Sequence, residues 1–259
     1  HWEEPNPPYP YQELSGYPYG AIRGYQSLGL FKDQDEIDNS PSQFGTLMPG
    51  DIKYRDVNGD GVINANDMIP LSYSTYPLFM YGFGGEFRYK DLTVGVLFRG
   101  TGKTDFFHVG YGSGNGNGVG YIPFYDGVNG NVLSIVKDPA NRWIPKKFAE
   151  ENGIDLKYAE NPNARFPRMT YGFNSNNSQL SDFWKGDSRY LRLQEVTVNY
   201  NLKRDFLRKL NISSIDFQLV GTNLFVWDKV KLFDPEQAHR NGSVYPIPTT
   251  YALQLYINL

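Results

Sequence analysis

Apolar and polar residues alternate along five segments of the chain, the pattern of β-strands with one apolar and one polar face. The alternation is cleanest near the C-terminus, where Tyr251, Leu253, Leu255, Ile257 and Leu259 share one face. The segments span about 78–89, 92–102, 189–202, 213–225 and 249–259. The pattern therefore predicts an all-β fold.

The first two segments have the pattern of a β-hairpin. Aromatic residues fill alternate positions of 79–89, and apolar residues alternate again over 92–98 after the short Lys90–Asp91 connection. In the third segment, the apolar phase shifts after Leu193. This shift predicts a β-bulge near Gln194–Glu195.

The connections between the strands alternate in length. Those at 90–91 and 203–211 are short, whereas 103–187 and 226–248 are long. Bacterial barrels have short periplasmic turns and long outer loops, so we expect the first strand to descend from outside and the last to end at the periplasm. Five strands cannot close around a lumen, and an open edge in lipid would leave backbone groups unsatisfied. We therefore expect an incomplete transmembrane antiparallel β-barrel, with the remaining strands supplied from elsewhere.

Two regions follow from this pattern. Residues 1–77 are rich in Pro, Tyr and Gly, and we expect an extracellular loop region that includes a calcium-type loop at 56–67. Residues 78–259 are expected to hold the C-terminal barrel strands with the two large outer loops, and a weak helical pattern lies near 145–153. The chain begins at His1 without an initiator Met, so we expect a processed or partial polypeptide.

Composition supports strands and irregular loops and excludes several functions. Aromatic residues make up 16% of the chain, which also has 27 Gly and 17 Pro. The net charge of −3 without a clustered basic face argues against nucleic-acid binding. The absence of Cys excludes disulfides and thiolate chemistry. The mean hydropathy of −0.51 and the lack of a long apolar run exclude a transmembrane helix, but barrel strands dilute this signal with lumen-facing polar residues.

Residues 56–67 follow the spacing of a calcium-binding loop, with oxygen ligands at positions 1, 3, 5, 7 and 12. The candidate ligands are Asp56, Asn58, Asp60, the backbone carbonyl of Val62, and Asp67. Gly at the sixth position permits the turn that wraps these oxygens, and Asp replaces the usual Glu at the twelfth. Because every liganding position is filled and no general base lies nearby, we expect a structural Ca²⁺. A metal-free Asx/Gly-rich turn is the alternative.

Two other classes of protein share part of these features. A dockerin-like calcium module would repeat the loop, but 125–131 supplies no second copy and the strands would stay unexplained. A lectin-like β-module or carbohydrate-active enzyme would use exposed Trp, and Trp143, Trp184 and Trp227 fall in predicted loops. In so aromatic a chain, such residues more often pack loops or form interfacial girdles. No acid pair, nucleophile motif or phosphate loop stands out, so we predict no catalytic residue and no enzyme.

Several motifs occur in the order found in SusC/RagA-family transporters. They are Gly-Asp-Ile-Lys-Tyr-Arg-Asp-Val-Asn-Gly-Asp-Gly at 50–61, Tyr81-Gly-Phe83, the strand at 190–200, Leu-Val-Gly-Thr-Asn-Leu-Phe at 219–225 and Tyr-Pro-Ile-Pro-Thr-Thr-Tyr-Ala-Leu at 245–253. The chain resembles the C-terminal portion of that family over nearly its whole length. It departs at Leu259, where barrels commonly end in an aromatic residue.

The resemblance implies a bacterial outer-membrane barrel of about 22 strands that imports glycans or peptides. It also implies an N-terminal plug, TonB as the energy source and a SusD-like surface lipoprotein as partner. We expect the plug, the TonB-contacting part and the rest of the barrel to lie outside this chain. The residues that contact cargo are not identified, but the polar strand faces are expected to line the lumen with Glu86, Arg88, Arg99, Asp216 and Gln218.

Overall fold

The computed structural model describes residues 6–71, 74, 76–108, 134–170, 174–240 and 244–259. These form two compact units, the first made of residues 1–75 and 105–186 and the second of residues 76–104 and 187–259. Each unit thus combines two stretches of chain that are distant in sequence.

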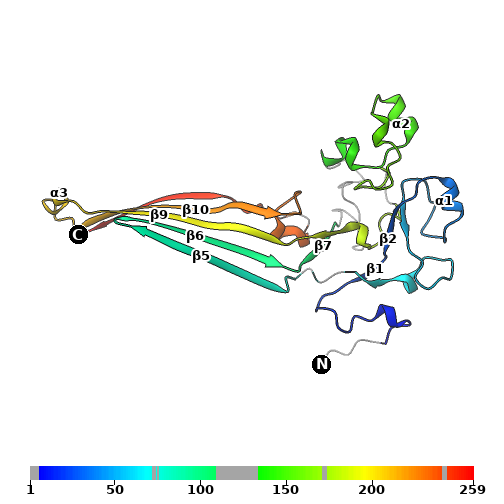
Figure 1. The fold of residues 1–259 in the computed structure, drawn as a ribbon, viewed down its shortest axis with the longest axis horizontal. Coiled ribbons are helices and arrows are strands. Elements are labelled where there is room, and N and C mark those ends of the chain that lie inside the picture. The colour runs from blue at the N-terminus through cyan, green and yellow to red at the C-terminus, as the bar shows by residue number, and fades with distance from the viewer. Residues whose placement is uncertain (1–5, 72–73, 75, 109–133, 171–173, 241–243) are drawn as a thin grey trace. The chain divides into compact units, whose positions relative to one another are not determined.

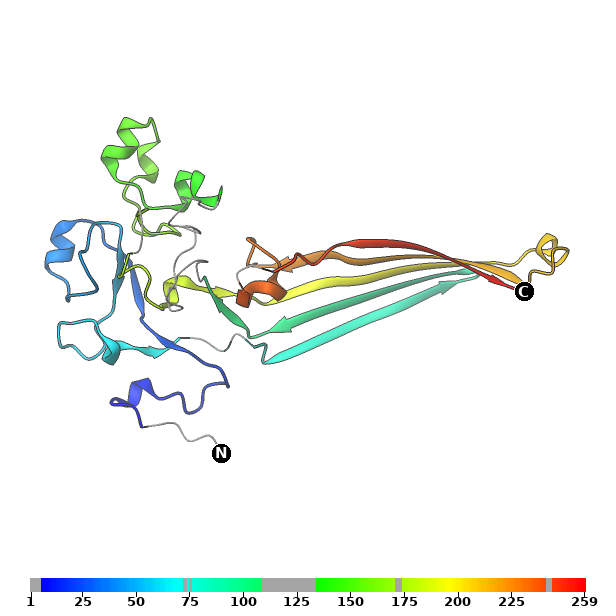
Figure 2. The same cartoon turned by 180° about the vertical axis from the view of Figure 1, so that it is seen from behind.

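The second unit is an antiparallel sheet of long strands lying side by side in the order β11-β10-β9-β6-β5 (Figure 1; Figure 2 shows the reverse side). The strands are β5 (Phe79–Tyr89), β6 (Leu92–Gly102), β9 (Tyr190–Leu202), β10 (Ser214–Asp228) and β11 (Thr250–Asn258). They correspond to the five predicted strands. The main difference is that β10 continues past residue 225, so Trp227 lies in a strand and its predicted loop position is wrong.

The strand register collects apolar and polar residues in alternate rows across the sheet. One row consists of Phe87, Val94, Val198, Leu219 and Leu253. The adjacent row consists of Arg88, Thr93, Asn199, Gln218 and Gln254. Because side chains of successive residues point to opposite faces of a strand, one face of the sheet is apolar and the other polar.

The predicted bulge in β9 is confirmed. Leu97 pairs with Glu195 whereas Phe98 pairs with Leu193, which leaves Gln194 as the extra residue. On the other side of β9, β10 shifts register beyond Thr222. Asn223 has a left-handed φ of 53° there, a conformation that Asn tolerates better than most residues, which explains Asn in the Gly-Thr-Asn motif.

The first unit contains short elements around its own hydrophobic core. Its strands are β1 (Arg23–Gly24), β2 (Ser27–Leu30), β3 (Ile52–Tyr54), β4 (Ile69–Pro70) and β7 (Asp105–Phe107), which pairs with β8 (Lys185–Asp187). Its helices are η1 (Pro10–Gln12), α1 (Gln34–Asp38), η2 (Ala65–Asp67), η3 (Ser134–Lys137), η4 (Pro139–Asn141), α2 (Lys146–Glu151), η5 (Leu156–Tyr158) and η6 (Asp182–Trp184). The second unit adds α3 (Asp205–Arg208) and η7 (Pro235–Arg240).

The core of the first unit joins the two stretches that the sequence pattern marks as loops. Tyr54 and Ile52 from the N-terminal stretch belong to one buried cluster with Trp143, Phe166 and Trp184 from the other. The two stretches are therefore one packed body, a feature that sequence periodicity did not predict. The helix expected near 145–153 is α2. Among the described residues, no helix combines the length and apolar character needed to cross a membrane.

A buried ion pair links the two stretches of the first unit. The Asp51 carboxylate is fully buried and accepts hydrogen bonds from Arg168 Nε at 2.7 Å and Nη2 at 3.1 Å. The side-chain amides of Asn174 and Asn177 donate to the same carboxylate, at 3.1 Å and 2.8 Å. Four charged or amide donors thus compensate the cost of burying Asp51.

Candidate functional site

The apolar face of the sheet is exposed over its whole width, which is unusual for a protein surface in water. Phe87, Leu219 and Leu253 of one row are 67%, 48% and 76% exposed. β5 and β6 have 11 residues each, the length that crosses a bilayer as a tilted strand. Such a face can be buried only by lipid or by another apolar surface.

Aromatic residues gather toward both ends of this apolar face. Phe225 and Trp227 lie 4.6 Å apart between ring centroids near the end with the long connections. Tyr89 lies beside the short turn of the β5–β6 hairpin, at the opposite end. Aromatic girdles at both membrane–water interfaces are typical of outer-membrane barrels.

At the long-connection end, Phe79 and Tyr81 lie across glycines of β6. A Cβ added to Gly100 would lie only 2.5 Å from the Tyr81 ring, and one on Gly102 would also meet the Phe79 ring. The Cβ on Gly100 would also lie 2.6 Å from the Tyr190 carbonyl oxygen, so this position requires Gly, whereas a side chain at Gly102 would displace the Phe79 ring.

The polar face carries the five residues expected to line a lumen. Register places Glu86, Arg88, Arg99, Asp216 and Gln218 on this face. Two of them already have protein partners. Arg99 ion-pairs with Glu236, and the Asp216 carboxylate accepts a hydrogen bond from Asn258 Nδ2 at 2.9 Å. A partnered side chain is less available to a cargo molecule than an unpaired one.

A charge cluster holds the segment after β10 to the polar face. Arg99 and Arg192 are directly paired across β6 and β9, which would be repulsive for two cations alone. The buried Arg192 guanidinium donates to both oxygens of Asp234, at 2.7 Å and 2.6 Å, and its Nε lies 3.0 Å from the Glu236 carboxylate. The acids at the start of η7 thus neutralise the two arginines. Sequence reasoning missed Arg192, Asp234 and Glu236 as a group.

Replacing Arg192 by Met is expected to release the start of η7. Removal of one partner of a buried ion pair costs about 3–5 kcal/mol, and of the two acids only Glu236 would keep an arginine partner, Arg99. The backbone amides of 234 and 236–238 should exchange hydrogen at least about tenfold faster than in the unaltered protein. Arg189→Met, which removes an exposed pair with Asp187, is the control. Unchanged exchange in Arg192→Met would contradict the anchoring role.

The calcium-type loop is closed by hydrogen bonds between its own residues. Asp56 accepts from the amides of Gly59 at 2.6 Å and Gly61 at 2.8 Å. Asn58 Oδ1 accepts from the Asp60 amide at 3.0 Å, and its Nδ2 donates to the Asp60 carboxylate at 2.9 Å. The predicted ligands at positions 1, 3 and 5 therefore belong to one tight turn.

Asp67, at the twelfth position, is fully buried and organises both ends of the loop. Its carboxylate accepts hydrogen bonds from the amides of Val57 at 2.8 Å and Asn64 at 2.9 Å, and it completes a capping box at η2. The N-terminal segment contacts η2, where the Tyr11 hydroxyl donates a hydrogen bond to the Asn66 carbonyl at 2.7 Å. Asp67 thus has a structural role without any metal.

The surroundings of Asp56 favour the ionised form of its carboxyl. Burial tends to raise the pKa of Asp56, but hydrogen bonds from the amides of Gly61 and Gly59 and the neighbouring Asp67 carboxyl outweigh it and hold that pKa below its usual value. Within the part of the chain that the structure describes, no three His, Cys, Asp or Glu side chains gather as a metal site. Any cation here would also need amide and carbonyl oxygens, such as those of Asn58 and Val62.

The three Trp residues considered for sugar stacking do not form such a platform. Trp143 and Trp184 are 4% and 1% exposed and belong to the core of the first unit. Trp227 is exposed but lies on the apolar face of the sheet, near Phe98 as well as Phe225. This arrangement removes the specific support for a lectin-like module.

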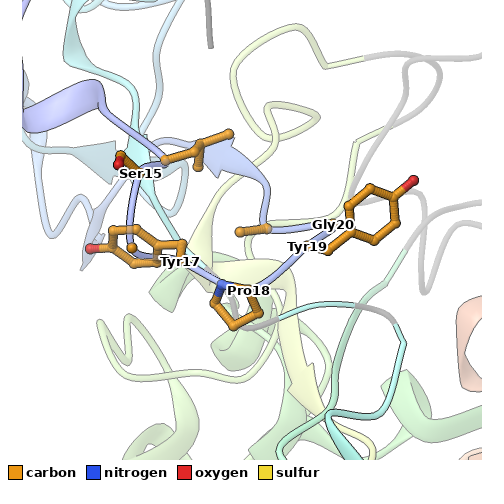
Figure 3. A pocket seen from close by; sticks show the side chains of 8 residues that line it. Ser15, Tyr17, Pro18, Tyr19 and Gly20 are labelled. Atoms are coloured by element: carbon orange, nitrogen blue, oxygen red, sulfur yellow. The ribbon is translucent and has the colours of Figure 1, made fainter. Parts of the chain in front are cut away.

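A hollow of about 600 Å³ lies along residues 14–21 of the first unit. Figure 3 shows the rings of Tyr17 and Tyr19 pointing away from each other on either side of Pro18. Tyr19 is 91% exposed. Because one short segment forms this hollow and its two rings diverge, it offers no convergent set of ligand contacts.

Two curated proteins similar to this chain are both named TonB-dependent receptors. The chain is 28% identical over 250 residues to TonB-dependent receptor P26 of Formosa agariphila and 23% identical over 231 residues to TonB-dependent receptor P3 of the same organism. The alignments cover 92% and 88% of this chain but only 22% and 20% of the two receptors. The chain thus spans about a fifth of the length of these relatives. No family model matches it.

Solved structures show the same fold. The RagAB peptide importer in its open-open state aligns with a TM-score of 0.58 at 15% identity, over 94% of this chain and 23% of the importer chain. A further structure of the RagAB peptide transporter aligns with a TM-score of 0.57, over 92% and 22%. The open sheet with one apolar and one polar face is therefore part of a barrel wall. The chain is thus similar in sequence to about a fifth of two TonB-dependent receptors and similar in fold to part of the RagAB importer chain.

Proposed function

We propose that the chain supplies C-terminal barrel strands and outer loops to an importer in the bacterial outer membrane. The observation that carries this proposal is the sheet register, which produces continuous apolar and polar rows across five strands. The apolar face contacts lipid, and the polar face lines the lumen or contacts a plug domain. The role is transport, not catalysis.

The complete importer works with several partners. The named relatives support TonB as the energy source, and the RagAB peptide importer supports a second, SusD-like component at the cell surface. The remaining strands and the plug come from the rest of the same protein. Glycans or peptides are the proposed cargo.

The composition of the detergent-extracted particle tests this proposal. Native separation and peptide identification should find this chain with upstream barrel and plug sequence and with a SusD-like lipoprotein. Deleting the transporter should also abolish uptake of its glycan or peptide cargo by intact cells. A monomer of about the 29.6 kDa of this chain, stable without detergent, would contradict the proposal and favour a calcium-binding β-module.

We further propose that the loop at 56–67 holds a structural Ca²⁺ through Asp56, Asn58, Asp60, the Val62 carbonyl and Asp67. The complete spacing of oxygen ligands and the neighbouring Asp56 and Asp67 carboxyls support this proposal. Bound Ca²⁺ would neutralise these acids and hold the loop in one conformation. Tyr11 and Gln12 donate hydrogen bonds to carbonyls of η2, so a fixed loop would also stabilise the position of the N-terminal segment.

Asp60→Ala should weaken Ca²⁺ binding to the chelator-treated transporter at least about tenfold, because it removes one charged oxygen ligand. Calorimetric titration measures this change. Asp38→Ala, which alters an acid at the end of α1 outside the loop, is the matched control. Equal Ca²⁺ affinity in Asp60→Ala and the unaltered transporter would refute the site.

A further inference from the structure

A second pocket lies within the first unit, and no residue of the calcium-type loop borders it. It has a volume of about 480 Å³ and is bordered by Met48, Arg142, Trp143, Phe148, Glu160 and Met169. Most of its walls are apolar side chains, and three charged residues, Arg142, Arg168 and Glu160, also border it. This combination suits a small ligand that has both an apolar and a charged part.

Arg142 is the unusual group in this pocket. Its guanidinium carbon lies 5.7 Å from the centroid of the Phe148 ring, and its Nη1 lies 3.2 Å from the Met169 sulfur. Its Nε is buried without a hydrogen-bond partner, and burial lowers the pKa of the group. Among the described residues, no carboxylate lies within ion-pair distance of Arg142. A partly buried cation without an anion is costly to maintain.

Arg168 differs from Arg142 because it has a carboxylate partner within the protein. It borders the same pocket but directs its guanidinium to the buried Asp51, so its charge is neutralised within the protein. Arg142 has only ring and sulfur contacts. Arg142 therefore has a charge that an anion entering the pocket could pair with.

Trp143 provides a second unpartnered donor beside Arg142. Backbone pairing fixes this pair of residues, since the Trp143 amide donates to the Phe166 carbonyl at 3.0 Å. The indole Nε1 is buried without a hydrogen-bond partner, although buried Trp usually has one.

Glu160 is the opposing charge at the rim. It has a left-handed φ of 53°, and its carboxylate accepts a hydrogen bond from the Lys146 amide at 3.3 Å. This contact directs the carboxylate to the start of α2 and not to Arg142. Its negative charge would still weaken the binding of an anion. Neutralising Glu160 should therefore raise the affinity for an anion, whereas neutralising Arg142 should lower it.

We propose that this pocket binds a small ligand in which one carboxylate is attached to an apolar group about the size of a leucine side chain. The carboxylate pairs with Arg142 in a charge-assisted contact, and the apolar group contacts Met48, Phe148 and Met169. The inference concerns binding by the first unit and does not depend on import, because it can be measured on purified transporter without TonB.

Titration of the purified full-length transporter with N-acetyl-L-leucine, followed by ligand-detected NMR, tests this inference. Arg142→Gln should weaken binding at least about tenfold, whereas Glu160→Gln should tighten it about two- to fivefold, because the two charges act in opposite directions. Arg165→Gln is the control, since this exposed arginine contacts the Phe166 ring and does not border the pocket. Its affinity should stay unchanged.

A neutral probe separates the carboxylate from the apolar group. N-acetyl-L-leucine amide should bind at least about tenfold more weakly than the acid, and Arg142→Gln should not weaken it further. Equal thermal unfolding of all variants shows that the fold is intact. Equal binding of acid and amide, equal binding in Arg142→Gln, or no binding of the acid would overturn the inference. Uptake by cells is measured separately, so a failed pocket leaves the import proposal standing.

Discussion

Leu253→Arg is expected to destabilise the assembled barrel by about 2–4 kcal/mol, because it places a cation on the lipid-facing side of β11 near mid-strand. Leu253 belongs to the apolar row that crosses all five strands, and the residue is 76% exposed. In the membrane that exposed surface contacts acyl chains, where an unpaired guanidinium is poorly solvated. Urea unfolding of the transporter in lipid vesicles measures the loss.

Gln254→Arg is the matched control for this prediction. It introduces the same residue one position further along β11, on the polar face. A lumen-facing arginine remains hydrated, so the midpoint of unfolding should hardly change. Equal destabilisation by the two substitutions would show that the two faces of the sheet do not meet different solvents.

Asp51→Ala is expected to destabilise the first unit by about 3–5 kcal/mol, because it leaves the Arg168 guanidinium largely buried without its anion. The substitution also removes the acceptor for the Asn174 and Asn177 amides. The Ile52 amide depends on the same network, since it donates to Asn177 Oδ1 at 2.9 Å. Hydrogen exchange should therefore accelerate at Ile52 and across 174–178.

Asp155→Ala provides the comparison for Asp51. Asp155 pairs with Lys157 on the surface, where both side chains are mostly exposed and water replaces the lost contact. Exchange at Ile52 should stay unchanged in this variant. If Asp51→Ala also leaves it unchanged, the buried ion pair does not hold the two stretches of the first unit together.

The sheet was predictable from sequence because the pattern that defines each strand lies within one short segment. A repeat of two residues along each strand reports directly which side chains share a face, and the phase shift after Leu193 indicated the bulge. Connection lengths then indicated which end of the sheet bears the long loops. The tight turn around Asp56 was equally local in sequence, whereas the Ca²⁺ proposed for 56–67 stays a prediction.

The first unit was not predictable in this way. Its regular strands have only two to four residues, too short for a periodic pattern, and Asp51 and Arg168 are 117 positions apart. The segment 174–177 has the polar composition of a loop, yet Asn176 and Asn177 are buried because their amides bond to Ile52 and Asp51. Similarly, nothing in the sequence showed that Arg192 would bind Asp234, 42 positions later.

Single-cysteine accessibility along β11 tests the central claim most directly, because the chain has no Cys of its own. Each position from 252 to 257 is replaced in turn in the transporter in lipid vesicles, with any cysteine elsewhere in the protein removed. Positions 253, 255 and 257 should be quenched by nitroxides on lipid chains, while 252, 254 and 256 should react with a water-soluble maleimide. Uniform maleimide reactivity without quenching at any position would contradict a strand whose two faces meet lipid and lumen.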